Sequence, residues 1–208
     1  MPNTRIAILI SGRGSNMIAL SEAVKSGAIP NAEIVLVLSD NADAGGLLAA
    51  TERGIETLVV ERSSRKRDEH ESEIIAALKQ RRVDLICLAG YMRMLSSSFV
   101  ETFPRRILNI HPSLLPSFPG LHVQQQAITH GVKWSGCTVH FVDNTLDGGP
   151  IIAQRVVQVL DNDTEDKLAE RILEQEHQLY AEAVALVISG NFSVDGRRVV
   201  KRGRVIYG

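Results

Sequence analysis

The feature that most constrains the fold is an alternation of short apolar runs with helical segments. β-Branched and other apolar residues fill five short runs, at residues 5–10, 33–38, 57–60, 84–89 and 107–110. Between them, apolar residues recur at helical spacing, as at Met17, Leu20 and Val24. Such an alternation predicts parallel strands joined by crossover helices. We therefore expect an α/β fold with an open, mostly parallel twisted sheet and helices on both faces, of the Rossmann-like kind.

Further elements are predicted toward the C-terminus. The run at 136–142 alternates as a strand, and the run at 151–159 is a further strand. Thr164 caps a long helix that continues to about residue 188. In the same way, Ser96 caps a short helix that ends near residue 102. The tail is typical of a terminal hairpin, with apolar residues set among basic ones at Val199, Val200, Val205 and Ile206.

Length and charge limit the classes of function. A chain of 208 residues suits one domain, here residues 1–208, and is long enough to bury a substantial core. The net charge of -1 gives no overall basic excess to hold a nucleic acid. We therefore expect small-molecule partners, with substrate anions bound by local groups.

The cysteines and the N-terminus indicate a cytoplasmic protein. Cys87 and Cys137 lie far apart in apolar runs, with no histidine at metal-ligand spacing, and are expected to be reduced core residues. The first apolar run is too short for a signal sequence or a membrane span, so no membrane partner is expected.

A glycine-rich loop, Ser11-Gly-Arg-Gly-Ser-Asn16, follows the first predicted strand and begins the first helix. Its glycines let a ligand approach the backbone, and the helix offers free N–H groups to a phosphate. The dinucleotide fingerprint needs a third glycine where Met17 stands, and no Walker loop is present. A plain tight turn with Ser15 as the helix cap is the alternative.

Asn109 and His111 leave the same face of the strand that Pro112 ends. An amide and an imidazole side by side can stabilise an oxyanion, and a carboxylate such as Asp147 can stabilise the charged imidazole. The three residues together predict acyl-transfer chemistry. The alternative is that Asn109 and His111 end a strand before a proline-rich loop, and that Asp147 caps a turn.

The sequence around these residues resembles that of the folate-dependent formyltransferase family. The strings are Asn109-Ile-His-Pro-Ser-Leu-Leu-Pro116, then Pro119-Gly120, then Leu146-Asp-Gly-Gly-Pro150. Within that family the chain is most similar to the enzymes that formylate glycinamide ribonucleotide. The resemblance implies a one-carbon transferase of de novo purine biosynthesis, active as a monomer or homodimer. It moves the formyl group of 10-formyltetrahydrofolate, its co-substrate, to the nucleotide's amine and requires no metal.

The resemblance also implies roles for individual residues. The catalytic residues are Asn109, His111 and Asp147. The nucleotide's phosphate is held by Gly14, Ser15 and Asn16, and its amine faces Glu176. The folate is bound by Arg67, Met92, Arg93, Met94, Leu95 and Asn109. Residues up to about 103 form the phosphate-binding half, and residues from about 104 form the catalytic and folate-binding half.

Other functions stay open at this stage. Methionyl-tRNA formyltransferase and formyltetrahydrofolate hydrolase share the Asn, His and Asp, but each is expected to carry an added domain that 208 residues do not accommodate. A nucleotide-binding oxidoreductase would need an acidic ribose-binding residue, for which Asp40 lies in about the right region. The roles of His122 and His140 are not determined, since each could face the cleft or lie elsewhere.

Overall fold

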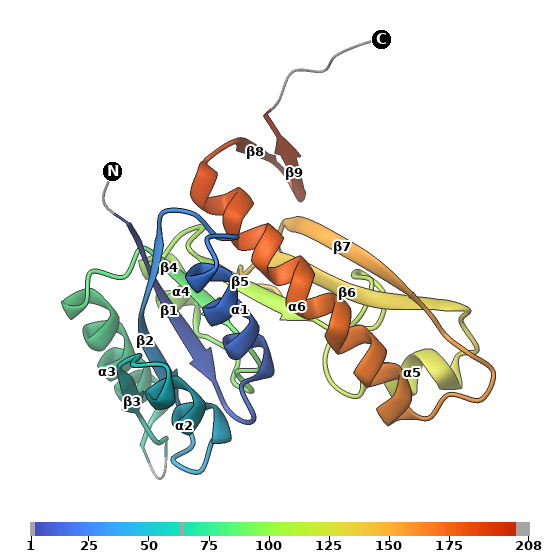
Figure 1. Ribbon diagram of the computed structural model, residues 1–208, viewed down its shortest axis with the longest axis horizontal. Coiled ribbons are helices and arrows are strands. Elements are labelled where there is room, and N and C mark those ends of the chain that lie inside the picture. The colour runs from blue at the N-terminus through green and yellow to red at the C-terminus, as the bar shows by residue number, and fades with distance from the viewer. Residues whose placement is uncertain (1–2, 63–64, 203–208) are drawn as a thin grey trace.

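A computed structural model describes residues 3–62 and 65–202 of the protein, and in this part of the chain the strands form one nine-stranded sheet (Figure 1). The strands are β1 Thr4–Ile10, β2 Ala32–Ser39, β3 Thr57–Val59, β4 Leu85–Leu88, β5 Ile107–His111, β6 Trp134–Phe141, β7 Ile151–Gln158, β8 Phe192–Asp195 and β9 Arg198–Lys201. Their order is β3-β2-β1-β4-β5-β6-β7-β9-β8. Strands β1 to β5 are parallel, whereas β6 is antiparallel to β5 and to β7. The predicted mostly parallel open sheet is confirmed.

The helices cover both faces of this sheet. They are α1 Ser15–Lys25, α2 Gly45–Glu52, α3 Arg67–Gln80, α4 Ser97–Thr102, α5 Val123–Thr129 and α6 Glu165–Ser189. Alternate residues of β1 pack against different layers, because side chains alternate across a strand. Ile6, Ile8 and Ile10 join a core that includes α1, α2, α5 and α6. Ala7 and Leu9 join a second core formed with α3 and α4.

Both predicted helix caps are present. The hydroxyl of Ser96 accepts a hydrogen bond from the backbone N–H of Phe99, three residues into α4. The hydroxyl of Thr164 accepts one from the backbone N–H of Lys167 at the start of α6. Each cap satisfies a helix N–H that has no partner within its own helix. Local side-chain chemistry therefore sets where these two helices begin.

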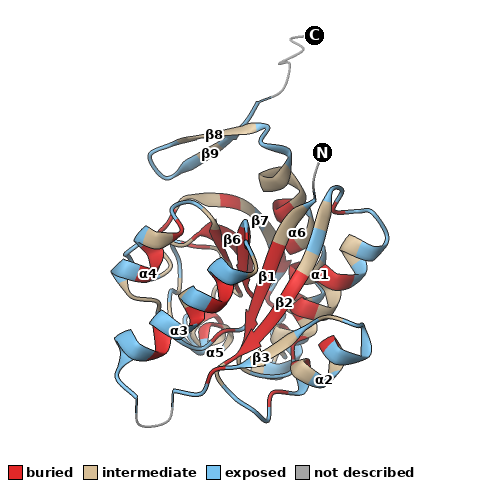
Figure 2. Cartoon of the chain, turned by 90° about the vertical axis from the view of Figure 1, so that its left-hand side faces the viewer, coloured by how far each residue is buried: buried red, intermediate tan, exposed pale blue. Residues whose placement is uncertain are grey.

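The described part of the chain ends in a hairpin formed by β8 and β9, which lies at the top of Figure 2 and is mostly exposed or half-buried. Val199 and Val200 lie in β9, and Phe192 of β8 packs on Phe141 with 5.8 Å between ring centroids. Val205 and Ile206 lie outside the described residues. Among the described helices, none is long and apolar enough to cross a membrane.

The parallel strands place three loops at one edge of the sheet. The loops that follow β1, β4 and β5 all leave carboxyl ends, and β1, β4 and β5 are neighbours. In open α/β sheets, ligands bind in the crevice outside this edge. The fold thereby collects the glycine loop (residues 11–16), the loop at 90–95 and the proline-rich loop in one region.

Candidate active site

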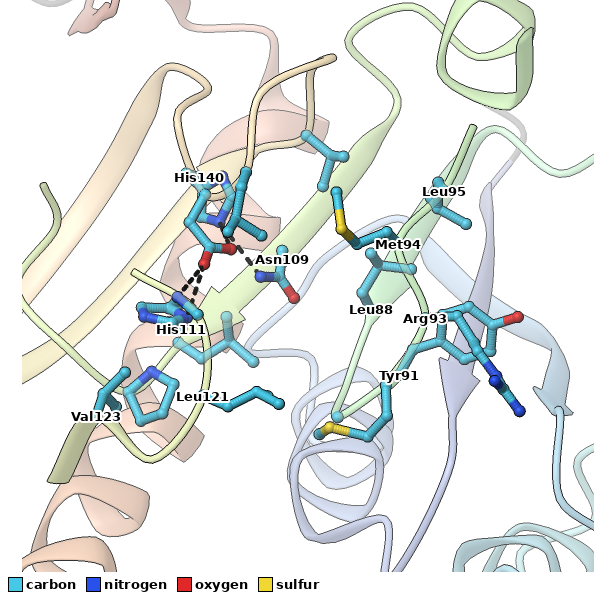
Figure 3. Close-up of a pocket in the computed structure, with 18 of the residues that line it drawn as sticks. Leu88, Tyr91, Arg93, Met94, Leu95, Asn109, His111, Leu121, Val123 and His140 are labelled. Atoms are coloured by element: carbon cyan, nitrogen blue, oxygen red, sulfur yellow. Dashed lines mark hydrogen bonds and ion pairs between the residues drawn. The ribbon is translucent and has the colours of Figure 1, made fainter. Parts of the chain in front are cut away.

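The centre of the site is the end of β5. Asn109 and His111 both line a cleft of about 540 Å³, and His111 is almost fully buried. The cleft walls come from four segments, at residues 88–95, 109–112, 120–124 and 140–147. Figure 3 shows Asn109 and His111 on the same side of the strand. The strand geometry expected from the Asn-x-His spacing is therefore present.

Both ring nitrogens of His111 face oxygen acceptors. Nε2 lies 2.9 Å from the carbonyl oxygen of Phe118, and Nδ1 lies 3.6 Å from Oδ2 of Asp147. Because a carbonyl only accepts, Nε2 is the donor in the first contact. The Asp147 carboxylate faces the other ring nitrogen, and the ring lies at the same end of β5 as the Asn109 amide.

Asp147 is held where its carboxylate faces the His111 ring. Its side chain is only 13% exposed, and its Oδ2 accepts a hydrogen bond of 2.9 Å from the backbone N–H of Gly120. Its backbone is left-handed, with φ of 49°. A Cβ at Gly149 would overlap the carbonyl oxygen of Phe141, and a Cβ at Gly148 would overlap the Thr145 hydroxyl. The two glycines after Asp147 are thus needed for this loop to close.

His140 is a functional candidate whose position the sequence did not determine. It pairs with Asn109 across β5 and β6, and Nδ2 of Asn109 lies 3.3 Å from its Nε2. Its Nδ1 donates to the Phe141 carbonyl at 2.9 Å, so Nε2 is free to accept from the amide. Burial lowers the pKa of His140, outweighing the opposing effects of the Phe141 carbonyl and Asp147. His140 is therefore neutral and fixes the orientation of Asn109.

The contact of 3.9 Å between His140 Nε2 and Asp147 Oδ1 is accordingly not an ion pair. Because the pKa of His140 is lowered, His140 brings no positive charge to Asp147.

His140→Ala is expected to lower kcat about tenfold, with smaller changes in KM, because the Asn109 amide loses the partner that orients it. Steady-state kinetics against both substrates measure the change. The control is Gln125→Ala, which alters an exposed side chain bonded within its own helix. Full activity of the His140 variant would show that Asn109 needs no such support.

The loop at 90–95, called here the cleft loop, supplies one wall of the cleft. Met92 and Met94 are 68% and 65% exposed, and Arg93 points its Nε to Asp40 at 2.7 Å. Arg67 does not line the cleft. It donates to the Met94 carbonyl at 2.5 Å and so supports the cleft loop from outside.

Similarity to known proteins agrees with this geometry. The sequence profile described as formyl transferase matches residues 4–184. The chain belongs to the formyl transferase family. It is 39% identical to phosphoribosylglycinamide formyltransferase of Escherichia coli (strain K12), over 95% of this chain and 97% of that one. A crystal structure of glycinamide ribonucleotide transformylase 1 from Symbiobacterium toebii matches with a TM-score of 0.94 and 46% identity, covering 97% and 95% of the two chains.

Longer proteins contain a region similar to this chain. The trifunctional purine biosynthetic protein adenosine-3 of Drosophila melanogaster is 48% identical over 89% of this chain. The chain spans only 14–19% of the length of this relative and the other trifunctional ones.

The glycine loop lies outside the cleft lining, and it meets α6 instead. Nδ2 of Asn16 donates to Oε2 of Glu176 at 2.7 Å, joining two residues expected to contact the nucleotide. Burial raises the pKa of Glu176 to about 7, while the Asn16 hydrogen bond opposes the shift. Oδ1 of Asn16 is buried without a hydrogen-bond partner among the described residues. The Asn16 side chain is thus turned toward Glu176, which leaves backbone N–H groups for a phosphate.

Gly14 has a structural reason to be glycine. Its φ is 76°, and a Cβ there would come within 2.7 Å of the Cα of Gly46 at the start of α2. A substitution at Gly14 would therefore disturb the packing of two helix ends, whatever the loop binds. Ser15, the first residue of α1, has no such restriction and is the better position for testing the loop.

Two other expectations concern cysteines and metals. Cys87 and Cys137 are buried free thiols, as predicted, and burial raises the pKa of each to about 12. Within residues 3–62 and 65–202, no cluster of three or more His, Cys, Asp or Glu side chains is placed to hold a metal ion.

Proposed function

We propose that the protein transfers the formyl group of 10-formyltetrahydrofolate to the amine of glycinamide ribonucleotide in de novo purine biosynthesis. The observation that carries the proposal is the meeting of Asn109, His111 and Asp147 at one end of an apolar cleft. The similarity to phosphoribosylglycinamide formyltransferase over nearly the full length of both chains supports this choice of acceptor.

The reaction joins the nucleotide amine to the formyl carbon and breaks the bond from that carbon to the folate nitrogen. Negative charge develops on the formyl oxygen as the amine attacks. The second N–H of Asn109, which His140 leaves free, donates to that oxygen, and the charge on His111 stabilises it electrostatically. Asp147 balances the imidazolium and relays the amine's proton through water to the departing folate nitrogen.

On the nucleotide side, the backbone N–H groups at the start of α1 bind the phosphate. They precede the first intrahelical hydrogen bond, which Ile18 donates to Gly14, so they point out of the helix end. Asn16 Oδ1 and the Glu176 carboxyl offer acceptors for the amine and its neighbouring amide. Since the pKa of Glu176 is raised to about 7, its carboxyl can exchange a proton at neutral pH.

On the folate side, the flat pterin and its linker lie between exposed apolar side chains at the cleft mouth. Met92, Met94, Leu121 and Leu146 are each more than half exposed. Thioether and leucine side chains suit a flat aromatic ligand, and Arg93 offers donors to its polar edge. Arg67 acts by holding the cleft loop through the Met94 carbonyl.

The oxidoreductase alternative loses its ribose-binding candidate. Both oxygens of Asp40 are engaged, one by the Ser11 hydroxyl at 2.6 Å and the other by Arg93 at 2.7 Å. The Asp40 side chain is also only 5% exposed. We further propose that the chain works in the cytoplasm as a monomer or homodimer. Groups from both sides of residue 103 line the cleft, and the chain is therefore proposed to work as one domain.

Incubating the protein with 10-formyltetrahydrofolate and glycinamide ribonucleotide tests the proposal. Tetrahydrofolate should form only when the nucleotide is present, and formylated nucleotide should appear in equal amount. Formate release without the nucleotide would support a hydrolase instead. Formylation of methionyl-tRNA in preference to the nucleotide would support the tRNA enzyme.

Ser15→Asp is expected to raise the KM for the nucleotide at least tenfold while changing the KM for folate little. A carboxylate in the first turn repels a phosphate at that site. It also interacts favourably with the positive end of the helix dipole, so the fold is expected to be retained. Steady-state kinetics give both constants. Ser97→Asp, which places the same charge at the first residue of another helix, α4, is the matched control. An unchanged nucleotide KM would exclude the glycine loop as the phosphate site.

A further inference from the structure

The cleft loop is held at both ends by buried carboxylates from outside the loop. Asp40 holds its beginning and Glu71 holds its end, and their side chains are only 5% and 7% exposed. Neither residue lines the cleft, so neither is placed to touch the folate. The two carboxylates differ in what else they contact.

Asp40 connects the cleft loop to the glycine loop. Its Oδ1 accepts from the Ser11 hydroxyl at 2.6 Å, and its Oδ2 accepts from Arg93 Nε at 2.7 Å. The same Ser11 hydroxyl accepts from the backbone N–H of Met92 at 2.9 Å. The backbone N–H of Ser11 donates to the Gly90 carbonyl at 3.1 Å. Ser11 is the first residue of the glycine loop. Two of its hydrogen bonds thus join that loop to Gly90 and Met92 of the cleft loop, and another joins it to Asp40, which anchors the cleft loop.

Glu71 holds the other end without reaching the glycine loop. Its carboxylate accepts from the backbone N–H and the hydroxyl of Ser96, and from Arg67 Nε at 3.0 Å. Arg67 in turn donates to the Met94 carbonyl. These bonds fix the cleft loop against α3 and α4 only, which makes Glu71 a natural comparison for Asp40.

We infer that Ser11 and Asp40 are positioning residues that couple the two substrate sites, so that each substrate binds more tightly when the other is bound. The inference rests on the proposed function, in which the glycine loop binds the nucleotide and the cleft loop binds folate. A ligand that fixes one loop also fixes Ser11, and hence the Met92 N–H and Arg93 of the other loop. The second ligand then meets a loop that is already ordered, and its ordering cost is smaller. By thermodynamic linkage, the gain in affinity is the same in both directions.

Calorimetric binding of tetrahydrofolate, the product that has no formyl group to transfer, tests the coupling. For the wild-type protein, saturating glycinamide ribonucleotide should tighten tetrahydrofolate binding about tenfold, which is within the usual range for coupled sites. In Ser11→Ala and in Asp40→Asn, the ratio of the two dissociation constants should fall to near one. A merely structural role would weaken binding in both conditions and leave the ratio unchanged.

Two control variants make the readout specific. Glu71→Gln should weaken tetrahydrofolate binding with and without the nucleotide, and preserve the wild-type ratio. Ser26→Ala, which removes an exposed hydroxyl at the far end of α1, should change neither constant. If Asp40→Asn does not fold by circular dichroism, Ser11→Ala decides, because it removes no charge.

Each failure has a distinct meaning. A wild-type ratio near one, or a ratio that survives in Ser11→Ala, would overturn the coupling while leaving formyl transfer intact. Absence of formylated nucleotide in the wild-type assay would instead overturn the proposed function.

Discussion

Replacing Asp147 by asparagine is expected to lower kcat about a hundredfold or more, with much smaller changes in either KM. The substitution keeps the shape of the side chain and removes its negative charge, which lies 3.6 Å from the ring of His111. The carboxylate charge that faces His111 is then lost, and the developing oxyanion loses electrostatic stabilisation. Because that oxygen carries its charge only in the transition state, the loss falls on turnover rather than on ground-state binding.

The Asp147→Asn variant separates charge from loop structure. Its remaining oxygen can still accept from the Gly120 N–H, so the loop is expected to keep its position. Steady-state kinetics measure kcat, and thermal unfolding checks that the fold is unchanged. Asp161→Asn removes an exposed carboxylate paired with Lys133, and it should leave kcat unaltered. Turnover near the wild-type rate would mean that Asp147 is only a turn residue.

Glu176→Gln is expected to remove a large pH dependence from the free energy of unfolding. Burial raises the pKa of this carboxyl from 4.5 to about 7, so the folded protein binds more protons than the unfolded chain between these values. Wild-type stability from this group is therefore fully present below pH 4.5 and is lost as pH rises to about 7 and beyond. Glutamine does not titrate. The free energy of unfolding of the variant, relative to that of the wild type, should therefore rise by on the order of 3 kcal/mol between pH 4 and pH 8.

Urea unfolding of the free protein at several pH values measures this difference. Glu174→Gln, an exposed position on the same helix, is the matched control and should follow the wild-type curve. Curves for Glu176→Gln and wild type that stay parallel from pH 4 to pH 8 would contradict a raised pKa. In kinetics, the same variant is expected to raise the KM for the nucleotide, since the amine loses an acceptor beside Asn16.

The sequence by itself predicted the strands of the parallel sheet and the residues at which two helices, α4 and α6, begin. The runs that form β1, β2 and β4 are almost wholly apolar because these strands are covered on both faces, and such runs are recognisable without tertiary information. The caps at Ser96 and Thr164 act within three residues of their helices, so their effect is local. The spacing of Asn109 and His111 placed both on one face of β5, since strand geometry has a period of two.

Only the tertiary structure decided which distant residues meet. His140 could not be assigned from sequence, because β6 is buried on both faces, so the polar side of the strand is not marked as facing solvent or cleft. The antiparallel register of β5 and β6 sets it opposite Asn109. Asp40 meets Arg93 because β2 and β4 both flank β1, and Asn16 meets Glu176 across 160 positions because α6 packs on α1. Such contacts depend on strand order and helix packing, and the local periodicity of the sequence encodes neither of them.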